Sequence, residues 1–180
     1  MKKIIMIMAV ASALFSCGQK QDSAATSTEA SKDSLGGMMT STDAKSQAIR
    51  DHLKAYVAND SVNYAPEIAD NVEVFFPEDT TADIKGKKAY TETFLGQHKM
   101  WADIKISSLR VMSVTLGNGE TWTDVWGIYT AKGRASGNSI LVPIHIVHLW
   151  DGDKVVKEIH FYDTKVIAVE AAAMAAAAKK

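Results

Sequence analysis

The chain has little cysteine and no excess of either charge. One cysteine among 180 residues excludes an internal disulfide framework, so a folded domain must be held by its apolar core. Twenty basic residues against 21 acidic ones give a net charge of −1, and no basic stretch with interleaved aromatic residues occurs. No nucleic-acid partner is therefore expected. Long apolar runs are also scarce, since the only one lies at the N-terminus.

What remains is the composition of an ordinary globular protein. Apolar residues make up 47% and charged residues 23% of the chain. A length of 180 residues leaves room for one domain with tails rather than for two domains.

The apolar run has the form of a signal peptide. Two lysines follow Met1, and the stretch from Ile4 to Phe15 is almost unbroken in its apolar character. It is shorter than the ~20 residues that a membrane-spanning helix needs, but it suits the apolar region of a secretory signal. The only cysteine of the chain, Cys17, lies where the run ends. An ordinary secretory signal with an incidental cysteine is the alternative.

The segment from Leu14 to Gly18 resembles the lipobox of bacterial lipoproteins, with Phe15 in place of the usual small residue. The resemblance implies that residues 1–16 are cleaved as a signal peptide and that Cys17 carries palmitate and other lipid tails. Several tails give a stable membrane anchor. Gly18 implies a place in the outer membrane of a bacterial cell envelope, with the periplasmic or surface face left open.

Two segments with biased composition flank the predicted domain, which spans residues 43–166. Residues 17–42 hold the lipidated cysteine and a stretch rich in Ser, Thr and Ala, which is predicted to be a disordered tether because it has little apolar surface to bury. Residues 167–180 are rich in Ala and end in two lysines. They are predicted to form a frayed helical tail without a function of its own.

The domain begins with helical patterns. Ile49, Leu53 and Tyr56 follow a helical spacing that begins near a cap at Thr42-Asp43. A short helical turn is predicted around Tyr64 and Ile68, with Pro66 in its first turn. A second amphipathic helix is predicted after Gly86; its apolar face holds Tyr90, Phe94, Leu95 and His98.

The rest of the domain is predicted to form strands. A short strand is predicted over 72–76, and extended segments over 104–116, 121–131, 140–150 and 155–163. Gly117-Asn118-Gly119 and Asp151-Gly152-Asp153 are hairpin turn signals. Two or three helices followed by a long antiparallel meander predict an α+β domain with helices on one face of the sheet.

Several strings in this order resemble the SnoaL-like branch of the nuclear-transport-factor-two-like superfamily. They span about Ala44 to Val166 and are Tyr64-Ala65-Pro66-Glu67, Ile84-Lys85-Gly86-Lys87-Lys88-Ala89, Trp150-Asp151-Gly152-Asp153-Lys154-Val155 and His160-Phe161-Tyr162-Asp163. The resemblance implies a cone-shaped, curved antiparallel sheet wrapped around two or three N-terminal helices, with an apolar pocket in its open end. Members include polyketide cyclases, ketosteroid isomerases, dehydratases and proteins without a known reaction, so the fold does not dictate the function.

His160 and His145 are the first candidate site residues. If Gly152-Asp153 are the central turn residues, Asp151 pairs with Lys154 and His145 with His160, on one sheet face. The resemblance implies an acidic, pocket-facing residue at the position of His160. A histidine there could act as a base or a hydrogen-bond donor. The alternatives are a surface pair or core histidines, and a slip of one residue would turn His145 to the other face.

Asp124 is a second candidate, since it lies between Trp122 and Trp126 on one face of a strand. Two flanking aromatic residues could desolvate it and raise its pKa, as a general acid or base requires. A solvated sheet face is the alternative. The resemblance implies an oxyanion donor at Tyr56, which could instead be a core residue with a polar end. Trp122, Trp126, Tyr56 and His160 are expected to converge on one cavity, where they and His145 would contact the ligand. Trp101 is expected to rim the pocket or to pack, and Tyr162 to contact a ligand.

Two hypotheses about function follow. The first is a membrane-anchored lipoprotein that binds a small apolar or amphipathic molecule without catalysis. The second is a cofactor-free isomerase, cyclase or dehydratase that uses His160, Asp124 and Tyr56 for proton transfer. The first is favoured because the expected acid is missing at His160; a buried Asp124 facing the other two would favour the second.

No cofactor and no metal are expected, because no metal-ligand spacing, phosphate-binding glycine string or nucleophile motif occurs. A homodimer through the sheet is a further expectation.

Overall fold

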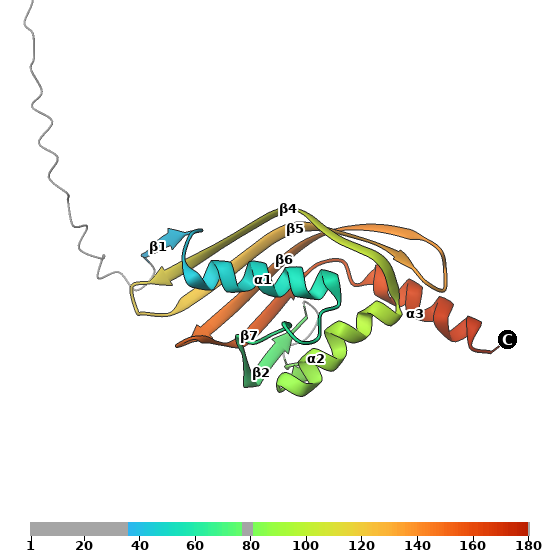
Figure 1. The fold of residues 1–180 in the computed structure, drawn as a ribbon, viewed down its shortest axis with the longest axis horizontal. Helices are drawn as coiled ribbons and strands as arrows, with labels where there is room; N and C mark the ends of the chain where they lie inside the picture. The colour runs from blue at the N-terminus through green and yellow to red at the C-terminus, as the bar shows by residue number, and fades with distance from the viewer. Residues whose placement is uncertain (1–35, 77–80, 180) are drawn as a thin grey trace, which may run out of the picture.

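The computed structural model describes residues 36–76 and 81–179. They form one α+β unit in which a curved seven-stranded sheet partly surrounds α1 and α2, while α3 lies at one end (Figure 1). The predicted signal peptide, Cys17 and the first part of the predicted tether lie outside these residues. No helix of the described residues is long and apolar enough to cross a membrane.

Helix α1 spans Ala44–Ala58 and has the predicted start. The carboxylate of Asp43 accepts hydrogen bonds from the backbone N–H groups of Lys45 and Ser46 at 2.9 and 3.0 Å, so the N-terminal cap is confirmed. The helix ends at Asn59, whose φ of 54° lies in the left-handed region. Its buried face rests on the concave side of the sheet (Figure 1).

The remaining helices are α2 (Lys87–Gly96), the 3₁₀ turn η1 (Gln97–Lys99) and α3 (Lys165–Ala177). Gly86 precedes α2 with a φ of 86°, a conformation that favours glycine. The predicted helical turn near Tyr64 is wrong. Ala65 has a φ of 62°, which a right-handed helix cannot accommodate, and Ile68 already begins a strand.

The sheet has the order β1-β4-β5-β6-β7-β2-β3. Its strands are β1 (Gly37–Thr40), β2 (Ile68–Phe75), β3 (Ile84–Lys85), β4 (Trp101–Leu116), β5 (Thr121–Gly133), β6 (Ser139–Asp151) and β7 (Lys154–Phe161). The predicted antiparallel meander is confirmed for β4 to β7. Because β2 pairs parallel with β7, the whole sheet is mixed rather than antiparallel.

Irregularities in β4 accompany the curvature of the sheet. The pairing of β4 with β5 shifts between Ala102 and Lys105 and again between Ser107 and Arg110. Asp103 and Ser108, inside these shifts, have φ values of 54° and 51°. Such bulges bend a strand and increase its twist. The long strand thereby curves over α1, as Figure 1 shows.

The end of the predicted tether is ordered, which corrects the sequence-based boundary. Gly37–Thr40 forms β1 and pairs with β4 from Leu116 back to Ser113. All four residues are exposed. The segment is therefore held by backbone hydrogen bonds to β4. Side-chain composition does not predict such an interaction.

The predicted frayed tail is also a docked helix. Glu170 of α3 is buried and accepts hydrogen bonds from the backbone N–H groups of Ala135 (2.7 Å) and Ser136 (3.3 Å) and from the Ser136 hydroxyl. A Cβ at Gly133 would lie 2.0 Å from Glu170 Oε2, so glycine is needed for this close approach. The helix is therefore docked by a carboxylate as well as by Val166 and Ile167 in its first turn, and its alanine-rich sequence does not indicate this polar contact.

Candidate functional site: an aromatic cavity with a buried carboxylate

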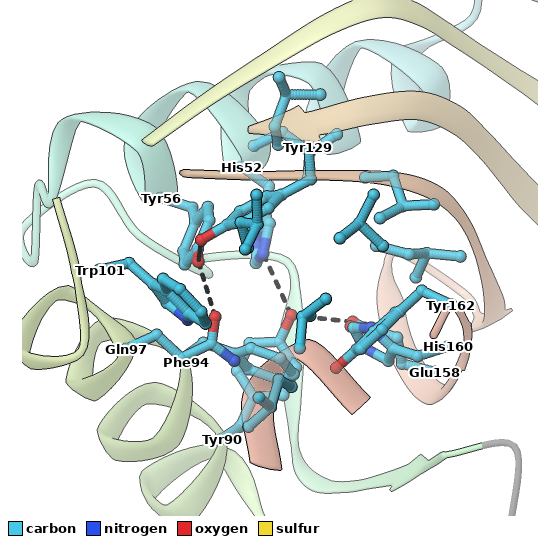
Figure 2. Close-up of a pocket in the computed structure, with 18 of the residues that line it drawn as sticks. His52, Tyr56, Tyr90, Phe94, Gln97, Trp101, Tyr129, Glu158, His160 and Tyr162 are labelled. Atoms are coloured by element: carbon cyan, nitrogen blue, oxygen red, sulfur yellow. Dashed lines mark hydrogen bonds and ion pairs between the residues drawn. The ribbon is translucent and has the colours of Figure 1, made fainter. Parts of the chain in front are cut away.

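A cavity of about 90 Å³ lies between the helices and the concave side of the sheet (Figure 2). Its walls are mainly aromatic and aliphatic: Leu53, Tyr56, Tyr64, Tyr90, Phe94, Trp101, Ile106, Tyr129, Ile140, Val142, Ile144, Ile146, Tyr162, Val166 and Ile167. The polar side chains that line it are His52, Gln97, His148, Glu158 and His160. Most of the polar ones gather at one end.

Glu158 is the centre of that polar end. It lies on β7 and is only 2% exposed. The Tyr90 hydroxyl donates to its Oε2 at 2.8 Å, and His160 Nε2 donates to its Oε1 at 2.5 Å. Burial by itself raises the pKa of Glu158, but it is outweighed by the charge and hydrogen bond of His160 and by the charge that His148 carries once acid protonates it, so the pKa is lowered to about 2. Glu158 is therefore a carboxylate at neutral pH.

A second carboxylate is connected to the first through Tyr90. The Tyr90 hydroxyl also lies 3.1 Å from His52 Nε2, and His52 Nδ1 lies 2.5 Å from Glu67 Oε1. Because the single hydroxyl proton of Tyr90 is donated to Glu158, Tyr90 must accept from His52, whose Nε2 therefore carries a hydrogen. One buried polar chain thus joins Glu67 in the turn before β2, His52 on α1, Tyr90 on α2, and Glu158 and His160 on β7. The contact of His52 Nδ1 with Glu67 Oε1 is close but lacks hydrogen-bond geometry.

His148 completes the polar end with an acceptor. Its Nδ1 lies 3.2 Å from the Thr123 carbonyl, which can only accept, so Nδ1 carries the hydrogen. Burial lowers the pKa of His148, with the opposing effects of Glu158 and Thr123 too small to reverse it. In the neutral ring Nε2 is then a lone-pair acceptor, 3.5 Å from Glu158 Oε2.

The opposite side of the cavity holds phenolic groups. The Tyr56 hydroxyl donates to Gln97 Oε1 at 2.7 Å and lies 3.2 Å from the Tyr129 hydroxyl (Figure 2). Burial raises the pKa of Tyr56 far above its usual value and that of Tyr129 to about 12. Both phenols therefore stay protonated at neutral pH.

Four of the residues singled out in the sequence line this cavity. They are Tyr56 on α1, Trp101 at the start of β4, His160 on β7 and Tyr162 just after β7. His160 lies with its ring stacked on Phe94 at a centroid distance of 5.2 Å.

The other four lie on the outer face of the sheet, so the expected convergence of all these residues is wrong. The Asp124 carboxylate is 3.1 Å from His145 Nε2, and the His145 ring stacks on Trp126 at 4.7 Å. Trp122 shares this face of β5, because side chains two residues apart point the same way. None of the four lines the cavity.

The expected pairing of His145 with His160 fails because of a bulge. Asp151 pairs with Lys154 as predicted, but the register shifts between Leu149 and Trp150. His160 consequently pairs with Ile146, and His145 pairs with Phe161. One inserted residue reverses the facing of every side chain beyond it.

Sequence reasoning missed Glu158, His52, Glu67 and His148. A usable signal existed for Glu158, since it lies two residues before His160 on one strand and must share its face. His52 likewise lies three residues after Ile49 on the helical face. Nothing local marks Glu67, which precedes β2 in a turn. Among the described residues, no group of three or more His, Cys, Asp or Glu side chains is arranged to hold a metal ion.

Comparison with solved structures agrees with this architecture. An NTF2-like protein from Burkholderia xenovorans superposes with a TM-score of 0.55 at 16% identity, over 70% of this chain and 94% of that one. A putative SnoaL-like polyketide cyclase from Shewanella denitrificans gives 0.53 at 12% identity, over 70% and 95%. A putative isomerase from Bacillus subtilis gives 0.54 at 13% identity, over 71% and 91%.

No family model and no curated protein matches the chain. At these identities the structural likeness establishes the fold, which is the NTF2-like α+β cone, with an open, mixed sheet.

Proposed function

We propose that the protein is a membrane-anchored binding protein that holds a small apolar or amphipathic molecule in the cavity. The observation that supports this most strongly is the cavity itself: a preformed space with apolar walls and a few polar groups at one end. Ligand sites in proteins typically have this composition. The resemblance of the residues around Cys17 to a lipobox supports the anchor, and with it a place in the cell envelope.

The cavity volume limits the size of the ligand. A cavity of about 90 Å³ is smaller than the ~150 Å³ engineered cavity that binds benzene. The ligand therefore has roughly six non-hydrogen atoms or fewer if the walls keep their positions. This argues against a polycyclic substrate in the closed cavity.

A cofactor-free isomerase, cyclase or dehydratase is the second candidate. It is favoured by Glu158 and His160, which lie in contact inside the cavity, with Tyr56 across from them as a proton donor. The low pKa of Glu158 weighs against it, because such a carboxylate is a weak base at neutral pH. Asp124, the acid that sequence reasoning assigned to proton transfer, lies outside the cavity.

Extraction and mass spectrometry of protein purified from its host test the proposal. A small molecule should co-purify with the unmodified chain and should be lost from Ile144→Trp, which fills the cavity. The matched control is Leu141→Trp on the same strand, where the side chain is exposed and the ligand should be retained. Loss of the molecule from neither variant, or from both, would overturn binding in this cavity. Conversion of the extracted molecule to a new compound by the intact protein, abolished in Glu158→Gln, would favour the enzyme.

A further inference from the structure

The polar end of the cavity offers acceptors to a ligand. The nearest donors to Glu158 already form hydrogen bonds, because His160 and the Tyr90 hydroxyl both donate to its carboxylate. They are therefore not available to donate to a ligand. An ionised carboxylate can accept about four hydrogen bonds, and these two leave part of that capacity open. His148 Nε2 adds a lone pair 3.5 Å from Glu158 Oε2. A ligand group that reaches this end must therefore donate hydrogen bonds.

The walls beside it are aromatic. Tyr56, Tyr129, Phe94, Trp101 and Tyr162 surround the open space in Figure 2 and come from different parts of the fold. The face of an aromatic ring is electron-rich and attracts a cation within about 6 Å of its centre, most strongly when water is excluded. Methyl groups attached to a cationic nitrogen suit such walls.

The cavity offers little to an anion. No Lys or Arg is among the described residues that line it, and His160 is already paired with Glu158, whose carboxylate would repel a negative group. A neutral alcohol would donate a single hydrogen bond to the polar end, whereas an alkylammonium donates up to three.

On the basis of the proposed binding function, we infer that the ligand is a small organic cation. It is an alkylammonium whose N–H groups contact Glu158 and His148 and whose alkyl groups contact the aromatic walls. The small volume of the cavity limits it to a few carbon atoms.

Three probes with five non-hydrogen atoms each test the charge of the ligand: tert-butylammonium (as the chloride), tert-butanol and propionate (as the sodium salt), each titrated into the full chain by calorimetry at neutral pH. The ammonium should bind at least tenfold more tightly than tert-butanol, and propionate should not bind. Glu158→Gln should weaken ammonium binding tenfold or more and leave tert-butanol binding nearly unchanged. Glu92→Gln, which removes an exposed carboxylate from α2, is the matched control and should change neither.

The inference and the proposed function fail separately in this experiment. Tighter or equal binding of tert-butanol, or tighter binding of propionate, overturns the cation and leaves the binding function standing. If no probe binds, the charge of the molecule extracted from the host decides: a neutral or anionic molecule overturns the inference, and a cation supports it. If no probe binds and nothing co-purifies, the proposed function falls as well. If Glu158→Gln does not fold, the probe series on the unmodified chain still decides the charge of the ligand. Tyr129→Leu should then weaken ammonium binding, because it removes an aromatic side chain from the cavity wall.

Discussion

His160 Nε2 donates to Glu158 Oε1 at 2.5 Å, and both residues point inward from the same face of β7. The family resemblance places an acid at the position that His160 occupies. The protein keeps an acid in the cavity, but two residues earlier along the strand. Histidine and carboxylate thus form a pair in place of a single isolated acid, and the pairing holds the carboxylate in its charged form.

Glu158 should make the protein sensitive to acid. Its folded-state pKa is depressed to about 2 from a usual 4.5, so its stabilising interactions are fully present above pH 4.5 and are lost as the pH falls toward 2. The difference corresponds to roughly 3 kcal/mol of the free energy of unfolding. Glu158→Gln should flatten this part of the stability curve, as measured by urea unfolding at a series of pH values.

Four other polar groups face Glu158, namely His160, His148, His52 and Tyr90. The effect of His148 on stability can be separated from that of Glu158 by its pH range. The lowered pKa of His148 means that stability falls already below about pH 6.5, because the unfolded chain takes up a proton that the folded ring does not. Glu158→Gln should therefore keep the loss that begins below about pH 6.5 and remove the additional loss that Glu158 contributes below pH 4.5. Parallel curves for the variant and the unmodified chain would contradict the assignment.

One tryptophan should report ligand binding. Of the four tryptophans, only Trp101 lines the cavity and is 3% exposed, whereas Trp126 is 38% exposed on the outer face. A bound ligand should change the emission of the unmodified chain and of Trp126→Phe, and should change that of Trp101→Phe much less. Acrylamide should quench the Trp126 emission most strongly. An emission change that disappears with Trp126→Phe would place the ligand on the outer face of the sheet and contradict binding in the cavity.

Helix α3 should be loosened by changes at either end of its polar contact. Glu170→Ala removes charge-assisted hydrogen bonds, each of which contributes about 1.5 kcal/mol or more when buried. Gly133→Ala should also loosen α3, because the new Cβ would displace the Glu170 carboxylate from the loop that it contacts. Hydrogen exchange of the α3 amides should accelerate tenfold or more in both variants. Gly137→Ala, at a loop position with open space but a positive φ, tests whether a strained loop alone has this effect. Unchanged exchange in the first two variants would mean that α3 is held by other contacts.

The protease-resistant core should begin no later than Gly37. Backbone pairing with β4 protects β1, and a Cβ at Gly37 would lie 2.6 Å from the Thr115 carbonyl oxygen. Gly37→Val should therefore move the start of the resistant fragment toward Thr42, as mass spectrometry of a limited digest would show. Met38→Val, in the same strand with an exposed side chain, is the control and should keep the original start. A resistant fragment of the unmodified chain that begins at Thr42 would contradict the pairing.

Cys17 should carry the lipid. Cells that express the unmodified chain should incorporate labelled palmitate into it, and Cys17→Ser should remain unlabelled and uncleaved at that site. Equal labelling of the two chains would remove the anchor from the proposal and leave the cavity untouched.

Local patterns in the sequence determined much of the framework. The carboxylate at Asp43 caps α1 because the partners it needs are two and three residues away. The turn at Gly152 and the antiparallel order of β4 to β7 also follow from short-range signals. The same kind of signal, alternation along β7, could have identified Glu158 beside His160.

The facing of His145 and Asp124 was decided only by the tertiary structure. The register of β6 and β7 shifts by one residue between Leu149 and Trp150, which reverses the relative facing of the side chains beyond that point. No residue type in the sequence predicts this bulge. The chain from Glu67 through His52 to Glu158 brings together groups far apart in sequence, which only the packing of α1 and β2 against β7 unites. The docking of β1 and α3 depends in part on a free sheet edge and a loop that present backbone groups. The spacing of apolar residues and turn signals determines where helices and hairpins form, because their hydrogen bonds join residues close in sequence. Which side chains meet in the cavity depends on pairing between segments far apart in sequence, and local spacing does not encode that pairing.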